Sequence, residues 1–228
     1  MTTHCVIRRK IQDILNKIVE DTFDLLSKDL IQVIKKVENK TQLTESISLL
    51  LNKGLIETNY MVLYASVCCK LANLNIHDEG TEYTFQTELL NLFHLITDIF
   101  PCSDREKQKY LRAVQFSGYI SQKNDYFRTF TNNLIDTMLK FDDVEFAAEG
   151  LCKILPLIST FLKHFDLFSQ LKPTTPRIKY LMMDALDSIA KEPCKGTIMK
   201  KSTFGLQIGY RFLKKKFGSS FNKEIDYF

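Results

Sequence analysis

Residues 60–74 read YMVLYASVCCKLANL, and this stretch decides the fold class. Its large apolar side chains recur every three or four residues, at Tyr60, Leu63, Tyr64, Val67, Leu71 and Leu74. Because an α-helix completes a turn in about 3.6 residues, this spacing places them on one helical face. Such a face is stable only when it is buried against a neighbour. The stretch therefore predicts a core helix, with Tyr60 and Tyr64 in the core.

The same spacing recurs along most of the chain. It predicts helices with apolar faces over residues 11–18, 23–37, 41–52, 85–100, 127–138, 144–158 and 178–189, with a less regular segment over 163–170. Helix boundaries are also readable. Thr41 or Thr44 is expected to cap the third helix, Pro101 to end the fifth, and Ser103 with Glu106 to form a capping box. Pro156 is expected to kink its helix.

The chain has few residues that favour turns, with 8 Gly and 5 Pro among 228 residues. Sandwiches and barrels need many more turns, so an all-α fold is predicted. Helices joined by short loops, in pairs of roughly 35 to 45 residues, have the size of HEAT-type repeats. We therefore expect a helical-repeat solenoid of about five antiparallel helix pairs. A compact helical bundle would show many of the same apolar faces.

The charge distribution separates a C-terminal tail from the rest. Between Pro193 and Lys223 there are eight Lys and Arg residues and no acidic residue. The predicted organisation is thus a helical solenoid over residues 1–192 and a basic, aromatic tail over residues 193–228.

Nothing in the sequence indicates catalysis, a cofactor or a metal site. The chain lacks a phosphate-binding loop, a GxSxG motif and an HExxH motif, and its six Cys form no CxxC pair. The amino-terminal residues resemble no secretory signal, and no apolar stretch is long enough to span a membrane. We expect a non-enzymatic, cytoplasmic protein with reduced thiols.

Four stretches resemble the middle domain of eukaryotic translation initiation factor four gamma. They are RKIQDILNKI at residues 9–18 with Phe23-Asp24, ETNYMVLYASVC at 57–68, QFSGYI at 115–120, and RIKYLMMD at 177–184. They follow the order and approximate spacing of the family. The chain departs from it at residues 19–22, which replace a Pro-containing turn, and at Thr58, Ser117 and Tyr119.

The resemblance implies a HEAT-repeat docking platform for the DEAD-box RNA helicase of the initiation complex. It implies helicase contacts at Asn16, Lys17, Ile18, Phe23 and Glu57, in the turns of the first two helix pairs. Leu15, Ile18 and Phe23 have the alternative of closing the first repeat's core. For Leu15 the core role is favoured. For Asn16 and Lys17 the surface role is favoured, because a polar pair has little reason to interrupt an apolar face.

Arg177 and Asp184 lie seven residues apart, on one face of the last helix. They either face a helicase lobe or pair with neighbouring repeats and hold that helix in place. The two alternatives stay open at this point.

The tail invites a second hypothesis, an RNA-binding helical-repeat adaptor in mRNA processing or decay. Its candidate phosphate-binding residues are Lys200, Lys201, Arg211, Lys214, Lys215 and Lys216. The alternative is a solvated tail. The Y-x-x-x-x-L-Φ motif (Φ apolar), by which relatives recruit the cap-binding protein, is absent. The predicted partners are the helicase and, secondarily, mRNA. The cap-binding protein stays an alternative partner that the tail would have to recruit through another motif. The chain is expected to be a monomer outside the complex.

Overall fold

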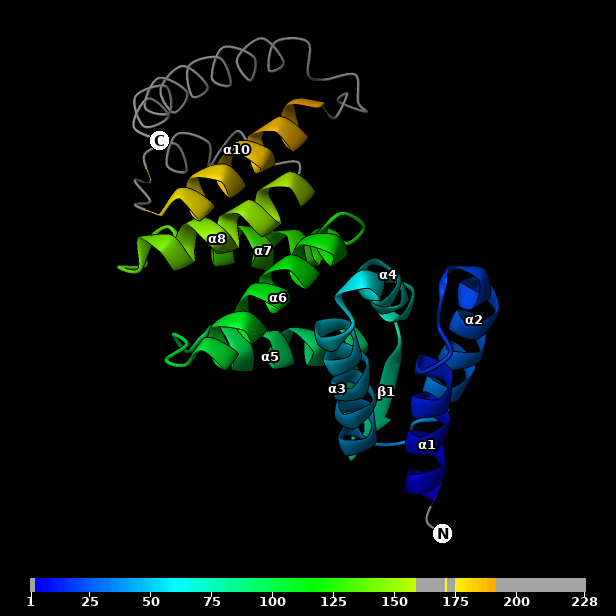
Figure 1. The fold of residues 1–228 in the computed structure, drawn as a ribbon. Helices are drawn as coiled ribbons and strands as arrows, with labels where there is room; N and C mark the ends of the chain where they lie inside the picture. The colour runs from blue at the N-terminus through cyan, green and yellow to red at the C-terminus, as the bar shows by residue number, and fades with distance from the viewer. Residues whose placement is uncertain (1–2, 159–170, 172–174, 192–228) are drawn as a thin grey trace, which may run out of the picture. The chain divides into compact units, whose positions relative to one another are not determined.

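The computed structural model describes residues 3–158, 171 and 175–191 (Figure 1). The chain divides into two compact units, Met1–Thr131 and a second unit that begins at Asn132, and each is described by itself. The predicted all-α fold is confirmed, and the helices pack as repeated pairs. The tail beyond residue 192, and with it the predicted boundary at 192/193, lies outside the described residues.

The first unit begins with two helix pairs. Their members are α1 (Thr3–Leu15), α2 (Phe23–Ile34), α3 (Lys40–Ile56) and α4 (Met61–Leu71). Helix α1 packs against α2 and α3, while α4 packs against α3 and α2 (Figure 1). The apolar face of residues 60–74 is buried as predicted at Tyr64, Val67 and Leu71, whereas Tyr60 is half-buried.

A short β-hairpin follows α4 and was not predicted. Strands β1 (Asn75–Asp78) and β2 (Thr81–Thr84) pair antiparallel, with Ile76 opposite Tyr83. The connecting residues Glu79 and Gly80 have φ of 49° and 80°, a tight-turn geometry that favours glycine.

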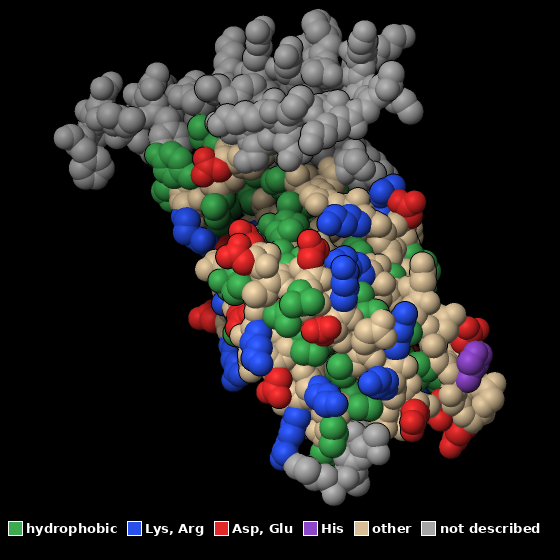
Figure 2. Space-filling model, turned by 90° about the vertical axis from the view of Figure 1, so that its right-hand side faces the viewer, with side chains coloured by type: hydrophobic (Ala, Val, Ile, Leu, Met, Phe, Trp, Pro, Cys, Tyr) green, Lys and Arg blue, Asp and Glu red, His purple; other side chains and the backbone are tan. Residues whose placement is uncertain are grey.

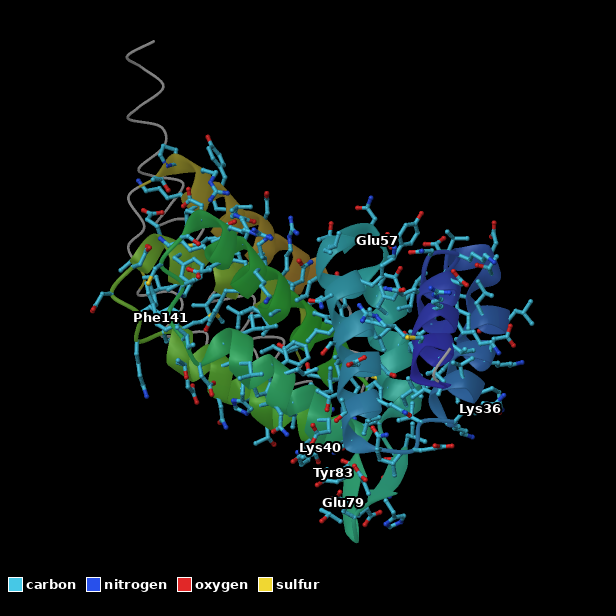
Figure 3. All side chains as sticks on the ribbon, turned by 90° about the horizontal axis from the view of Figure 1, so that it is seen from below. Lys36, Lys40, Glu57, Glu79, Tyr83 and Phe141 are labelled. Atoms are coloured by element: carbon cyan, nitrogen blue, oxygen red, sulfur yellow. The ribbon has the colours of Figure 1, made fainter. Side chains whose placement is uncertain are left out.

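The hairpin is attached to the start of α3. The Lys40 backbone N–H donates to Asp78 Oδ2 at 2.9 Å, and Lys40 Nζ lies 4.7 Å from the centre of the Tyr83 ring. Figure 3 shows Lys40, Tyr83 and Glu79 together at this end of α3 and Glu57 at the other. The hairpin therefore extends the second helix pair without interrupting it.

Three further helices are α5 (Phe85–Thr97), α6 (Asp104–Ser121) and α7 (Asp125–Met138), the last of which continues into the second unit. Helix α5 packs against α3 and α6, and α6 packs against α4. The Phe93 ring centre lies 6.0, 5.8 and 5.7 Å from those of Phe116, Phe127 and Phe130. This aromatic cluster forms the core where the three helices meet.

In the second unit, α8 (Val144–Ile154) packs against α10 (Pro176–Lys191). The α10 face containing Ile178, Met182 and Ala185 is buried, as the spacing predicted. Phe141 stacks on Phe146 at 6.0 Å between ring centres (Figure 3). The less regular segment over 163–170 lies outside the described residues.

Several predicted helix boundaries were wrong. Asn39, and neither Thr41 nor Thr44, caps α3, because its side chain accepts the Gln42 N–H at 3.0 Å. Pro156 lies in a separate 3-10 helix, Leu155–Leu157, instead of kinking α8. The fifth helix ends at Thr97, before Pro101, and leaves Phe100 exposed. The predicted capping box of Ser103 and Glu106 is confirmed.

Candidate partner-binding surface

Two turns of the first unit lie side by side, and we call them the paired turns. The first comprises residues 16–22, between α1 and α2, and the second residues 56–60, from the last residue of α3 to the start of α4. In the first turn, Thr22 Oγ1 donates to the Lys17 carbonyl at 2.8 Å and accepts the Val19 N–H at 3.1 Å. These bonds close the turn, which contains a proline in the initiation-factor domain that the sequence resembles.

Lys53, in the last turn of α3, connects the paired turns. Its Nζ donates to Asn16 Oδ1 at 2.8 Å and lies 2.6 Å from Glu57 Oε1. Two residues predicted from separate motifs are thus joined through a third that belongs to neither. The amide of Asn16 and the carboxylate of Glu57 are held in fixed positions at one end of the helices.

Tyr64 supports this network from inside the core. Its hydroxyl donates to Glu57 Oε2 at 2.6 Å and lies 3.3 Å from the Leu15 carbonyl oxygen. Burial, then the hydrogen bond to Glu57 and its charge, raise the pKa of Tyr64. Burial also raises the pKa of Glu57, but the hydrogen bonds from Lys53 and Tyr64 and the Lys53 charge outweigh it and lower that pKa overall. Glu57 is therefore an anion at neutral pH.

Exposed apolar side chains lie in the paired turns and in the helical turns that follow them. Val19 is 37% exposed and Ile56 is 70% exposed, each within one of the paired turns. Leu25 in the first turn of α2 and Val62 in the first turn of α4 are also exposed. Isolated exposed apolar residues are ordinary, but four in and beside the paired turns supply apolar contact area for a partner.

The five predicted helicase contacts of the first unit differ in accessibility. Asn16 and Lys17 are exposed, and Glu57 is half-buried. Ile18 is 2% exposed, so it shapes the first turn from the core and presents little surface of its own. Phe23 is half-buried beneath Lys70, whose Nζ lies 4.7 Å from the ring centre.

The two predicted contacts of the second unit lie on α10. Arg177 donates to Glu149 of α8, and Glu149 raises the pKa of Arg177. Just before α10, Thr175 donates its N–H and hydroxyl to Glu145 at 2.9 and 2.6 Å. For Arg177, these contacts favour the alternative in which it holds the last helix in place. Asp184 is exposed.

Neither a metal site nor a membrane segment is visible in the part of the chain that the structure describes. Residues 3–158, 171 and 175–191 contain no group of three or more His, Cys, Asp or Glu side chains placed to hold a metal ion. None of the described helices is long and apolar enough to cross a membrane. Burial raises the pKa of the Cys68 and Cys69 thiols and, with the charge of Glu149, that of Cys152 to about 12. These three thiols are thus poor nucleophiles.

The six basic residues of the predicted RNA site, Lys200, Lys201, Arg211, Lys214, Lys215 and Lys216, lie outside the described residues. Of the two predicted sites, only the helicase-binding site lies within the described residues, and its contacts are most extensive at the paired turns.

Comparison with known proteins supports a relation to one translation factor. The chain is 42% identical over 69 residues to eukaryotic translation initiation factor 4 gamma 2 of human, mouse and cattle. The match covers 30% of this chain and 7% of the length of those proteins. No family model matches the chain. The chain is thus similar, in part, to a translation initiation factor.

Two members of the network were not among the predicted site residues. Lys53 lies 37 positions from Asn16 in sequence, so no local pattern links them. Tyr64 was correctly predicted as a core residue, but its hydroxyl needs a hydrogen-bond partner when buried. Glu57 lies seven positions earlier, about two helical turns away, so the sequence alone could have suggested it as the hydrogen-bond partner of Tyr64.

Proposed function

We propose that this chain is a translation-initiation scaffold that binds a DEAD-box RNA helicase through the paired turns. The similarity to translation initiation factor 4 gamma 2 carries the translation role. The proposed contact is supported by the exposed, ordered amide of Asn16 beside the exposed side chains of Lys17 and Ile56. The protein would act in the cytoplasm, where initiation takes place.

The proposed mechanism is geometric and involves no chemistry by this chain. A DEAD-box helicase has two lobes that must close to bind ATP and RNA productively. A scaffold that binds the closed arrangement more tightly than the open one raises the closed population. The network of Lys53, Glu57 and Tyr64 suits this role because it orders the paired turns before the helicase binds. Such preordering lowers the entropic cost of association.

The direct test measures the RNA-dependent ATPase rate of the host's initiation helicase with and without this protein. Stimulation together with a stable complex is the expected result. No complex and an unchanged ATPase rate would reject the proposal. A complex that forms without stimulation would also reject the closing mechanism, because a scaffold that favours the closed state must raise the rate.

A paired set of variants locates the contact. The double variant Asn16→Ala/Lys17→Glu is expected to weaken helicase binding about tenfold or more, as for central interface residues. The matched control Gln108→Ala/Lys109→Glu changes an exposed amide and lysine on α6 and should leave binding unchanged. Circular dichroism must show the same helix content for both variants. Equal loss in the two variants would place the contact elsewhere.

Deleting residues 193–228 separates this function from the RNA-binding alternative. The proposal expects helicase binding to survive the deletion. If helicase binding is lost while RNA affinity falls with a steep salt dependence, the tail is the functional site and the paired turns are not.

A further inference from the structure

A second surface lies away from the paired turns, at the other end of the first helix pair. It is an open groove of about 490 Å³ between α1 and the carboxyl end of α2 with the residues that follow it. Its apolar lining consists of Val6, Ile7, Val33 and Val37, and its charged lining of Lys10, Lys35, Lys36 and Glu38. A volume of this size is typical of sites that bind small ligands or a few side chains of a peptide.

The basic side chains of this groove are free to bind a partner. Lys10, Lys35 and Lys36 are all exposed, and none of them makes a side-chain hydrogen bond or ion pair with any residue that the structure describes. Lys35 and Lys36 follow the carboxyl end of α2, where positive charge also offsets the helix dipole. Offsetting the helix dipole does not require an apolar groove beside Lys35 and Lys36. It also does not account for Lys10, which lies on the opposite wall of the groove.

The apolar lining gives the groove a second recognition element. Val6 is 38% exposed on α1, whereas Ile7 and Val37 form a buried floor at 8% and 5% exposure. Figure 2 views the molecule from the α1–α2 side and shows Lys and Arg side chains interspersed with hydrophobic and acidic ones. A ligand for this groove must therefore supply both negative charge and aliphatic or aromatic anchors.

We infer that the groove binds an acidic peptide segment with apolar anchor residues, provided by a partner protein. Three lysines against one glutamate give the charge complementarity, and the valine walls receive the anchors. RNA suits the groove less well, because single-stranded RNA is bound largely by stacking on aromatic side chains and none lines it. The inference goes beyond the helicase contact and is independent of it.

The probe is the fluorescein-labelled peptide DELLEEFLDELE, titrated with the full chain and followed by fluorescence anisotropy. Its uncharged counterpart NQLLQQFLNQLQ and an oligouridine RNA of equal length are titrated in parallel. The acidic peptide is expected to bind, and both comparison ligands are expected to bind at least about tenfold more weakly, because each lacks one recognition element.

Three variants test the position. Lys10→Gln/Lys36→Gln removes one lysine from each wall and should weaken peptide binding about tenfold. Val6→Ser removes an apolar contact without a change of charge and should weaken it about threefold or more. Arg105→Gln/Lys109→Gln removes the same charge from α6 and should change it less than about twofold.

Each other outcome overturns the inference. Equal weakening by the groove and α6 double variants would indicate diffuse attraction to a basic protein. Equal binding of oligouridine, lost in the groove variant, would assign the groove to RNA. Absence of peptide binding, with unchanged circular dichroism, would show that the groove binds no such segment. Helicase binding is not measured here, so failure of one proposal leaves the other standing.

Discussion

The hydroxyl of Tyr64 donates a hydrogen bond of 2.6 Å to the Glu57 carboxylate and so joins the core of the first unit to its surface network. The ring is fully buried, while Glu57 also contacts Lys53 at the surface. One side chain therefore contributes to both stability and the order of the paired turns. Variants of Tyr64 and of Glu57 therefore test different properties: the first tests stability, and the second tests how stability depends on pH.

Tyr64→Phe is expected to lower the free energy of unfolding by about 2 kcal/mol, because it removes a hydrogen bond to a charged group and keeps the packing. The Leu15 carbonyl, 3.3 Å from the hydroxyl, loses the same donor. Urea denaturation followed by circular dichroism measures the change. The control is Tyr60→Phe, which removes a half-buried hydroxyl without a hydrogen bond among the described residues. Similar costs in both variants would contradict the role given to the Tyr64 bond.

Glu57 makes stability depend on acid. Its pKa is lowered in the folded state from an ordinary value near 4.5, so its contribution is fully present above pH 4.5 and is lost as the pH falls through the lowered value. Glu57→Gln is therefore expected to reduce the Tm at about pH 7 and to reduce it by less at about pH 3, because protonation of the carboxylate removes part of its contribution. Thermal melts at both pH values measure this.

The control for Glu57 is Glu79→Gln. It removes an exposed carboxylate at the hairpin tip that makes no hydrogen bond or ion pair with a described residue. The Tm is expected to stay about the same at both pH values. If Glu57→Gln lowers the Tm equally at both pH values, the carboxylate's charge plays no part in its network.

Asn39 is expected to contribute about 1 kcal/mol to stability as the cap of α3, because its side chain satisfies the Gln42 N–H. Asn39→Ala should lower the free energy of unfolding by that amount. Thr41→Ala is the matched control, since Thr41 is exposed and its side chain has no hydrogen bond among the described residues. A larger loss from Thr41→Ala in urea denaturation would restore the original cap prediction.

The sequence predicted the helices well because their apolar faces repeat with a helical period. The capping box at Ser103 was also readable, since both partners lie within four residues. The hairpin was missed for a physical reason. Ile76 is the only buried residue of β1, and the contacts that attach the hairpin to α3 come from Lys40, far away in sequence. Neither strand therefore carries an alternating apolar pattern.

The candidate site was predictable only in part. Asn16, Lys17 and Glu57 came from the family resemblance, and the structure brings Asn16 and Glu57 together through Lys53. Local sequence patterns do not reveal such a bridge, because it depends on how α1 packs against α3. Ile18 had two open alternatives, and only its burial in the structure shows that it contributes to the core.

Gly54 of α3 is a close-contact position against α6. A Cβ built there would lie 2.9 Å from Phe116 Cζ and 3.3 Å from Tyr64 Cβ, and the Phe116 ring is fully buried. Alanine gains about 1 kcal/mol over glycine in helix propensity. Overpacking a core costs about 1–3 kcal/mol, so Gly54→Ala should destabilise the protein by about 1 kcal/mol net.

A double-mutant cycle identifies the cause of this cost. In a Phe116→Leu background the clashing ring atoms are absent, and Gly54→Ala should be less destabilising by about 1 kcal/mol or become stabilising. Urea denaturation of the four proteins gives the coupling energy. An identical cost in both backgrounds would show that the ring does not limit the approach of α3 to α6. The cost would then arise from the contact with Tyr64, the residue that also anchors the paired turns.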